Sequence, residues 1–255
     1  NINFVRGSSG NDSILGSTAN IFEQLEGGAG NDTLDGGVMT IVDGIATNGN
    51  RVSYQNALGA VMVDLQAGIA TVGVYTDTLS NFNQIRGSNQ GDSLYGSETT
   101  DYAELFDGRG GNDTIDGRGG FDIARYDLSP ATGGVNVNLQ SGIAADGQGG
   151  TDLLQNIEGI YGTSYNDTLV GNAGNDSLSG LDGNDVLDGG TGADQLAGGT
   201  GDEILILSDV RDAVTELPLG IDAGGNDTIV VAASFAQSLK DALPATQGKA
   251  AFVLG

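Results

Sequence analysis

Carboxylate side chains recur at a fixed interval along residues 162–206, and this spacing suggests metal binding. When the stretch is divided every nine residues from Gly162, position six of each unit is an acid: Asp167, Asp176, Asp185, Asp194 and Glu203. Acids brought together by a repeat would repel each other unless a cation lay between them. Ca²⁺ accepts roughly six to eight oxygens from carboxylates and carbonyls in a flexible geometry. The sequence therefore predicts calcium sites between repeated turns.

The same nine-residue units indicate the elements that would position these acids. Position one is always glycine and position eight is always leucine, at Gly162, Gly171, Gly180, Gly189 and Gly198 and at Leu169, Leu178, Leu187, Leu196 and Leu205. Glycine tolerates positive φ and close backbone approach, so it suits a turn. The period fits a six-residue turn and a three-residue strand whose middle residue points inward. Such a unit buries its leucine only when units stack, which predicts a solenoid.

The composition excludes several classes of function. The 255 residues include 45 glycines, 34 acids and 9 bases, giving a net charge of −25. We expect no nucleic-acid partner, because few bases are available to neutralise phosphates. The chain has no cysteine and no histidine, so disulfides, His-based zinc sites and Ser-His-Asp triads cannot form. No apolar run reaches the ~18–20 residues of a membrane helix, and NINFVRG at the start is no secretory signal.

Three segments resemble the G-G-x-G-x-D-x-U-x repeat of RTX (repeats-in-toxin) proteins: GGAGNDTLDG (27–36), GRGGNDTIDG (108–117) and GNAGNDSLSG (171–180). The resemblance implies an all-β fold, a right-handed parallel β-roll or β-solenoid (parallel β-helix) loaded with several Ca²⁺ ions. It also implies export by type I secretion to the extracellular space or the cell surface. Calcium would be the cofactor.

The resemblance also implies which residues bind the ions. In the family, an ion lies between turns two repeats apart, bound by carbonyls of positions two and four of the earlier turn, carbonyls of positions one and three of the later turn, and both aspartates. The first ion would take Thr163, Tyr165, Asp167, Gly180, Asp182 and Asp185. The second would take Asn172, Gly174, Asp176, Gly189, Thr191 and Asp194. The third would take Leu181, Gly183, Asp185, Gly198, Thr200 and Glu203. Tyr165 replaces a glycine and Glu203 an aspartate, so the second set follows the family most closely.

Other turns supply further candidate ligands. An ion between the first two nonapeptides would take Ser8, Gly10, Asp12, Gly27, Ala29 and Asp32, despite a two-residue insertion between them. The remaining candidates are Asp92, Gly108, Gly110, Asp113, Asp122, Asp152 and Asp227.

A longer repeat divides the chain. Its openings at Gly7, Gly87 and Gly162 are 80 and then 75 residues apart (87 − 7 and 162 − 87). We expect RTX-like segments at 1–86 and 87–161, a regular β-roll at 162–206 and a degenerate repeat at 207–255. Residues 38–86 show strand patterning and are interpreted as wider inserted coils. Residues 234–243 fit a helix or a strand. The final Phe252–Gly255 repeats the motif at Phe4–Gly7, so we expect a fragment of a larger solenoid.

The function predicted is a non-catalytic, calcium-binding structural module of a large secreted bacterial protein, such as an adhesin, an extracellular matrix protein or a surface-layer protein. It would fold and stiffen on binding Ca²⁺ outside the cell, and calcium removal should leave it disordered. The alternative is the non-catalytic C-terminal region of a secreted protease, lipase or polysaccharide-modifying enzyme. Ice binding is disfavoured, because position three forms no row of threonines. Expected partners are further repeats of the same polypeptide or other copies, and a cell-surface or glycan contact stays open.

Overall fold

The computed structural model describes residues 3–19, 21–42, 45–46, 49–128, 131–215, 225–231 and 251–254. These residues form strands and turns, with no helix among them. The chain divides into two compact units, one of Asn1–Ser129 with Gly149–Ile157 and one of Pro130–Gln148 with Glu158–Gly255, and each is described separately. Residues 234–243, which the sequence predicts as either a helix or a strand, lie outside the described residues.

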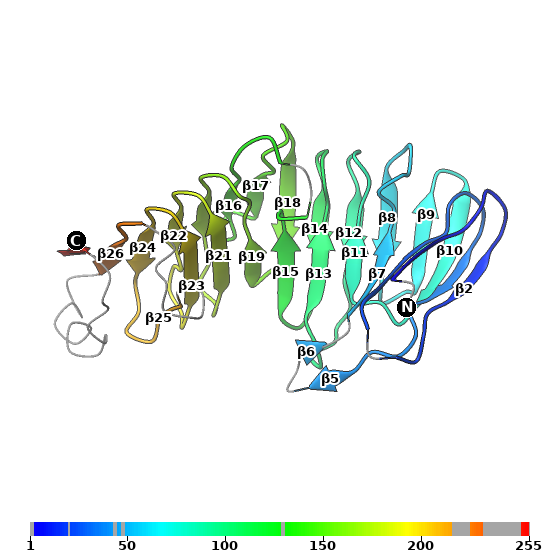
Figure 1. Cartoon of the computed structure of the whole chain (residues 1–255), viewed down its shortest axis with the longest axis horizontal. Coiled ribbons are helices and arrows are strands. Elements are labelled where there is room, and N and C mark those ends of the chain that lie inside the picture. The colour runs from blue at the N-terminus through cyan, green and yellow to red at the C-terminus, as the bar shows by residue number, and fades with distance from the viewer. Residues whose placement is uncertain are drawn as a thin grey trace. The chain divides into compact units, whose positions relative to one another are not determined.

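The first unit contains two sheets between which the chain alternates (Figure 1). Its first sheet is parallel, in the order β1 (Phe4–Arg6), β3 (Glu23–Glu26), β7 (Asn50–Ser53), β11 (Gln84–Arg86), β13 (Glu104–Asp107) and β15 (Asp122–Arg125). Its second sheet has the order β2 (Ser13–Leu15), β4 (Thr33–Asp35), β10 (Tyr75–Ser80), β9 (Ile69–Val72), β8 (Val61–Asp64), β12 (Ser93–Tyr95), β14 (Thr114–Asp116) and β18 (Thr151–Gln155). β5 (Ile41–Val42) and β6 (Ile45–Ala46) form a separate two-stranded antiparallel sheet.

The second unit repeats this alternation with shorter connections. One sheet has the order β19 (Gly159–Tyr161), β21 (Ser177–Asp182), β23 (Gln195–Thr200) and β25 (Ala213–Val214). The other has the order β17 (Ile143–Ala145), β16 (Asn136–Asn138), β20 (Thr168–Val170), β22 (Val186–Asp188), β24 (Ile204–Leu207), β26 (Thr228–Val231) and β27 (Ala251–Leu254). Because successive nonapeptides enter opposite sheets, neighbours within a sheet are two repeats apart, as Leu169 and Leu187 are.

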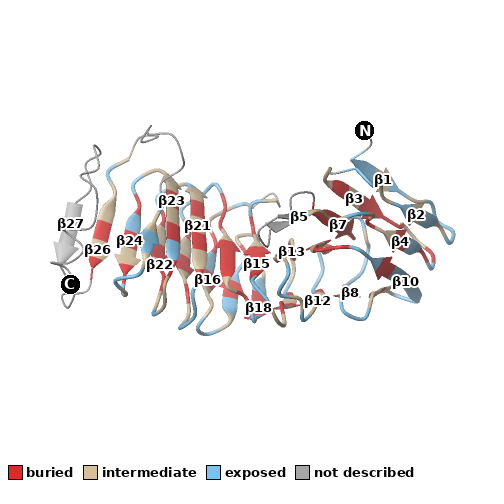
Figure 2. Cartoon of the chain, turned by 90° about the horizontal axis from the view of Figure 1, so that it is seen from below, coloured by how far each residue is buried: buried red, intermediate tan, exposed pale blue. Residues whose placement is uncertain are grey.

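Buried residues at position eight contribute to the core of both units, and in the regular repeats of the second unit they are leucines. Leu169, Leu187 and Leu205 pair in register along one sheet of the second unit, and all three are fully buried. Leu178 and Leu196 do the same in the facing sheet. Figure 2 shows the resulting line of buried residues along the strands. The predicted leucine ladder and the parallel β-roll are therefore confirmed.

The inserted coil at 38–86 contains a reversal of chain direction. β9 pairs antiparallel with both β8 and β10, whereas β8 and β10 pair in parallel with β12 and β4. Gly68 and Gly73, between these strands, adopt φ values of +67° and +61°, a conformation that glycine accepts without strain. In the second unit β16 and β17 are also antiparallel. The alternating pattern predicts strands here but not their direction.

Candidate metal centre

The acid that ends each turn is joined to the acid of the next turn in the same sheet. The backbone N–H of Asp167 donates to Oδ1 of Asp185 at 2.8 Å, and that of Asp176 donates to Oδ1 of Asp194 at 2.9 Å. In the second sheet of the first unit, Asp12, Asp32 and Asp77 are linked in the same way, as are Asp92, Asp113 and Asp152. We call these stacked acids the acid columns. They hold one oxygen of the accepting acid in each pair in place and leave its other oxygen for a different partner.

Several column acids carry a buried oxygen that has no hydrogen-bond partner. Oδ2 of Asp32, Asp185 and Asp194 is in this state, and each of these residues is at most 2% exposed. Oδ1 of Asp176 is likewise unsatisfied. Leaving a buried charged oxygen without a partner costs free energy, so native structures rarely do so. A cation at this position would remove that cost.

The electrostatics of the columns favour exchange of a proton for a cation. Burial raises the pKa of Asp185 to about 7, with a further contribution from the like charge of Asp167. Burial also raises the pKa of Asp194 to about 6. The pKa values of Asp92, Asp167 and Asp176 shift upward as well, again mainly because of desolvation. The upward shifts make these acids easier to protonate when no metal is bound, and a bound divalent ion would favour their ionised form.

Backbone carbonyls of the earlier turn point toward the later turn. A Cβ atom added to Gly190 would strike the carbonyl oxygen of Asn172, and one added to Gly192 would strike that of Gly174. Both glycines have positive φ, +83° and +151°. Glycine is needed here because any side chain would enter the space in front of these carbonyls. That space is bordered by carbonyl and carboxylate oxygens, the ligands that Ca²⁺ prefers.

Each such site would use side chains and backbone together. Among the described residues, no group of three or more Asp, Glu, His or Cys side chains is arranged to hold a metal ion. The columns instead pair two carboxylates with nearby carbonyls. The donor set contains only oxygen and fits a hard cation such as Ca²⁺.

Comparison with known families identifies the repeat. The family of the RTX calcium-binding nonapeptide repeat (4 copies) matches residues 1–20, 22–38, 105–124, 161–196 and 180–209. The chain therefore contains RTX-type calcium-binding nonapeptide repeats in these segments. Repeats of this family bind several Ca²⁺ ions. No curated protein matches the chain. The described part of the chain contains no helix long and apolar enough to cross a membrane.

The structure brings together the halves of the first two predicted RTX sites. In the first, Asp167 bonds to Asp185, and the Tyr165 carbonyl faces Gly183, where a Cβ would lie 2.5 Å from it. In the second, the N–H of Thr191 donates to the Asn172 carbonyl at 3.1 Å, beside the bond between Asp176 and Asp194. Of the remaining members of these sets, Thr163, Gly174 and Gly189 lie on the same paired turns. Gly180 and Asp182 lie at the end of β21, which leads into the later turn of the first set. The assignment of ligands remains a prediction.

The third predicted site differs in its backbone pairing. Leu181 and Gly199 pair as strand residues, and so do Asp182 and Thr200. The Thr200 carbonyl accepts the N–H of Gly183 at 2.8 Å, and the Thr200 hydroxyl donates to Asp182 at 2.6 Å. The Leu181 and Gly183 carbonyls still face the glycines of the later turn, Gly199 and Gly201. Gly198 and Glu203 complete this pair of turns, and the N–H of Glu203 donates to Asp227 at 3.2 Å.

The first long repeats contain two equivalent pairs of turns. Asp12 donates its N–H to Asp32 at 2.8 Å, and the N–H of Ala29 reaches the Ser8 carbonyl at 3.3 Å. The Ser8 and Gly10 carbonyls face Gly28 and Gly30, which follow Gly27 in the later turn. The N–H of Asp92 donates to Oδ1 of Asp113 at 2.8 Å, and a Cβ at Gly111 would meet the Gln90 carbonyl. Gly108 and Gly110 belong to this later turn.

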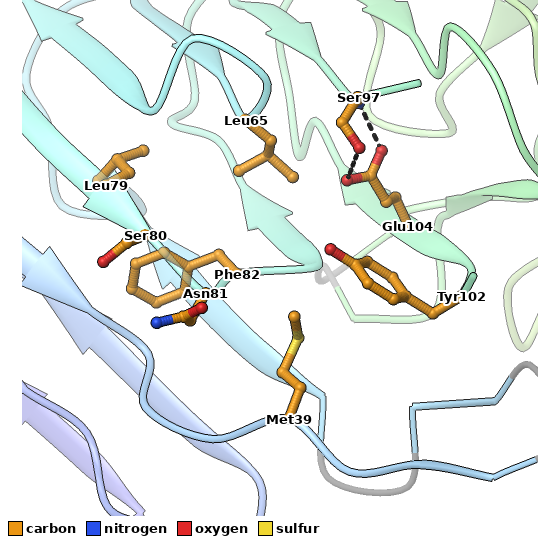
Figure 3. A pocket seen from close by; sticks show the side chains of 9 residues that line it. All are labelled: Met39, Leu65, Leu79, Ser80, Asn81, Phe82, Ser97, Tyr102 and Glu104. Atoms are coloured by element: carbon orange, nitrogen blue, oxygen red, sulfur yellow. Dashed lines mark hydrogen bonds between the residues drawn. The ribbon is translucent and has the colours of Figure 1, made fainter. Parts of the chain in front are cut away.

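Asp122 lies at the start of β15 in the first sheet of the first unit and pairs with an acid that the nonapeptide spacing missed. The N–H of Glu104 donates to Oδ1 of Asp122 at 3.2 Å. Figure 3 shows Ser97 donating its N–H and its hydroxyl to Glu104, at 2.6 and 2.9 Å. The N–H and hydroxyl of Thr163 bind Asp167 in the same way, at 2.6 and 2.8 Å. Glu104 therefore occupies the place of the turn aspartate.

Glu23 is the matching residue in the first long repeat. The N–H of Ser17 donates to Oε2 of Glu23 at 2.7 Å. In both long repeats the acid follows its turn glycine, Gly16 or Gly96, by more than the usual five residues, and the longer side chain of glutamate compensates for the inserted residues. Aligning GSTANIFEQL (16–25) with GSETTDYAEL (96–105) would have revealed this signal.

Proposed function

We propose that this chain is the calcium-binding structural module of a large secreted bacterial protein of the adhesin, matrix or surface-layer type. Ca²⁺ at the acid columns folds and stiffens it outside the cell. The nonapeptides supply stacked turns, and their core is little more than one ladder of leucines per sheet. Free energy of metal binding to sites absent from the unfolded chain acts as folding free energy.

The observation that carries this proposal is the set of buried, unsatisfied oxygens on Asp32, Asp185 and Asp194. They lie in turns whose facing carbonyls leave room only for glycine. Extracellular calcium modules bind at about 10⁻⁴–10⁻³ M, so the low free calcium of a cytosol would leave these sites empty. The chain would then pass through an exporter unfolded and fold on arrival.

Limited proteolysis at controlled free calcium tests this function. We expect rapid digestion at submicromolar free Ca²⁺, protection at millimolar Ca²⁺, and little protection by the same concentration of Mg²⁺, which demands a stricter octahedral geometry. Asp32→Asn and Asp185→Asn should shift protection to higher calcium. Equal resistance to protease with and without calcium would contradict the proposal.

A further inference from the structure

Asp77 ends one acid column, and its Oδ2 binds a tyrosine hydroxyl. Oδ2 of Asp32, Asp185 and Asp194 has no such partner, and we call the turns that end at these acids the open turns. Oδ1 of Asp77 accepts the N–H of Asp32 at 2.9 Å, as in every linked pair of the column. Oδ2 accepts the hydroxyl of Tyr54 at 2.9 Å. Both side chains are buried, with Tyr54 4% and Asp77 3% exposed. Burial and the nearby charges of Asp77 and Asp32 raise the pKa of Tyr54, so the neutral hydroxyl persists as a donor.

The second long repeat has the same arrangement at Asp152. Its Oδ1 accepts the N–H of Asp113 at 3.0 Å, and its Oδ2 accepts the hydroxyl of Tyr126 at 3.2 Å. Tyr126 is 5% exposed and follows β15 as Tyr54 follows β7. The two tyrosines thus occupy equivalent places in two copies of the long repeat. Their coincidence indicates a built feature rather than a chance contact.

Gly73 and Gly149, which precede Asp77 and Asp152, face no carbonyl, although a Cβ at Gly147 would meet the Gly133 carbonyl at 2.5 Å. A Cβ added to Gly73 or to Gly149 would meet no atom of the described chain within 4 Å. By contrast, a Cβ at Gly28 or Gly30 would strike a carbonyl of the preceding turn. Gly73 connects two antiparallel strands rather than stacking on a nonapeptide turn. A cation beside Asp77 would therefore find few carbonyl ligands.

We propose that the hydroxyls of Tyr54 and Tyr126 take the place of a cation, so that Asp77 and Asp152 belong to coils that bind no calcium. Each of these columns would then hold one ion position, between Asp12 and Asp32 and between Asp92 and Asp113, followed by a position closed by tyrosine. This inference rests on the proposed calcium binding of the open turns. It differs from the sequence-based expectation for Asp152.

Native mass spectrometry at saturating calcium tests the inference by counting bound ions. We expect Asp77→Asn and Asp152→Asn to hold as many ions as the unmodified chain, since neither acid serves an ion. Asp185→Asn is the matched control and should hold fewer ions. A lower count in Asp77→Asn or Asp152→Asn would overturn the inference. An unchanged count in Asp185→Asn would instead overturn the calcium ligands of the proposed function.

A second measurement requires no variant and covers the case in which Asp77→Asn or Asp152→Asn does not fold. Crystals of the calcium-loaded chain should show anomalous peaks between Asp12 and Asp32 and between Asp92 and Asp113. No peak should lie beside the hydroxyl of Tyr54 or Tyr126. A calcium peak at either hydroxyl would refute the tyrosine closure, even if every other site is occupied as proposed.

Discussion

Asp185 lies at the centre of the regular repeats and faces the turns on both sides of it. It accepts the N–H of Asp167 through its side chain, and its carbonyl accepts the N–H of Ile204. The side chain is fully buried, whereas Asp12, at the first turn, is half-buried. If the predicted ligand sets hold, Asp185 serves two ions and Asp12 serves one.

Replacing these two acids should therefore have unequal effects. We expect Asp185→Ala to destabilise the calcium-bound fold by about 1.5–3 kcal/mol, the range for a lost hydrogen bond to a buried charge, and to raise the calcium midpoint by roughly tenfold or more. Asp12→Ala should cost less than about 1 kcal/mol. Calcium titrations followed by circular dichroism compare them. Equal midpoints would count against the shared-ligand assignment.

Glycines in the later turns should be intolerant of any side chain. Gly192→Ala adds a Cβ against the Gly174 carbonyl at a φ of +151°, so it should destabilise by more than the about 1–2 kcal/mol of an unfavourable φ alone. Gly149→Ala, at φ +105° with no neighbour within 4 Å in the described chain, isolates the backbone effect. Gly59→Ala has neither problem and should be near neutral. Urea unfolding in the presence of calcium gives the loss of unfolding free energy for each variant. If Gly192→Ala loses no more than Gly149→Ala, the predicted clash with the Gly174 carbonyl is refuted.

The raised acid pKa values predict opposite pH effects with and without calcium. Burial raises the pKa of Asp185 from its ordinary 3.8 to about 7 in the folded chain. Between these values the folded metal-free chain binds a proton that the unfolded chain has lost, so its stability should fall as pH rises from about 4 to 7. Calcium competes with that proton, so calcium affinity should rise over the same range.

Thermal melts and calcium titrations at pH 5 and pH 7.5, in buffer stripped of metal, measure both trends. The metal-free chain should show more β structure at pH 5 than at pH 7.5. A metal-free chain that is more ordered at pH 7.5 would show that the column acids are not protonated in the fold.

At the scale of the elements, β18 offers adjacent leucines in contrasting environments. Leu154 is 4% exposed and pairs with Ile115 of β14 in the core, whereas its neighbour Leu153 is 49% exposed. Leu154→Ala should destabilise by about 2–5 kcal/mol through the cavity it leaves. Leu153→Ala removes the same atoms from the surface and should cost under about 0.5 kcal/mol. Denaturant midpoints measured in saturating calcium compare the two variants. Similar losses of stability would contradict the placement of Leu154 in the core and Leu153 on the surface.

Local spacing made the strands, the buried leucines and the turn acids predictable. Each nonapeptide carries its own turn glycines and inward leucine, so Leu169 and Leu187 could be placed without knowing the rest of the chain. The sequence did not reveal the reversal at β9, because alternation is the same in parallel and antiparallel strands. It also did not reveal Glu104, whose turn breaks the period, or the contact of Tyr54 with Asp77, which joins residues 23 positions apart.

At the scale of the whole molecule, negative charge and the demand for metal are linked. The chain carries a net charge of −25, and its described column acids are brought into register within each unit. Such charge opposes the compact state, and each Ca²⁺ bound offsets two negative charges. Salt screens exposed charges but screens a buried carboxylate much less. Calcium should therefore stabilise the fold where sodium chloride does not.

Far-UV circular dichroism of the whole chain, first in excess chelator and then with a few millimolar Ca²⁺, tests the central claim most directly. We predict a disordered spectrum in chelator at neutral pH and a β spectrum after calcium is added, with no such change on adding sodium chloride or Mg²⁺. A β spectrum that is the same in chelator and in calcium would contradict the claim that calcium holds the stacked turns together.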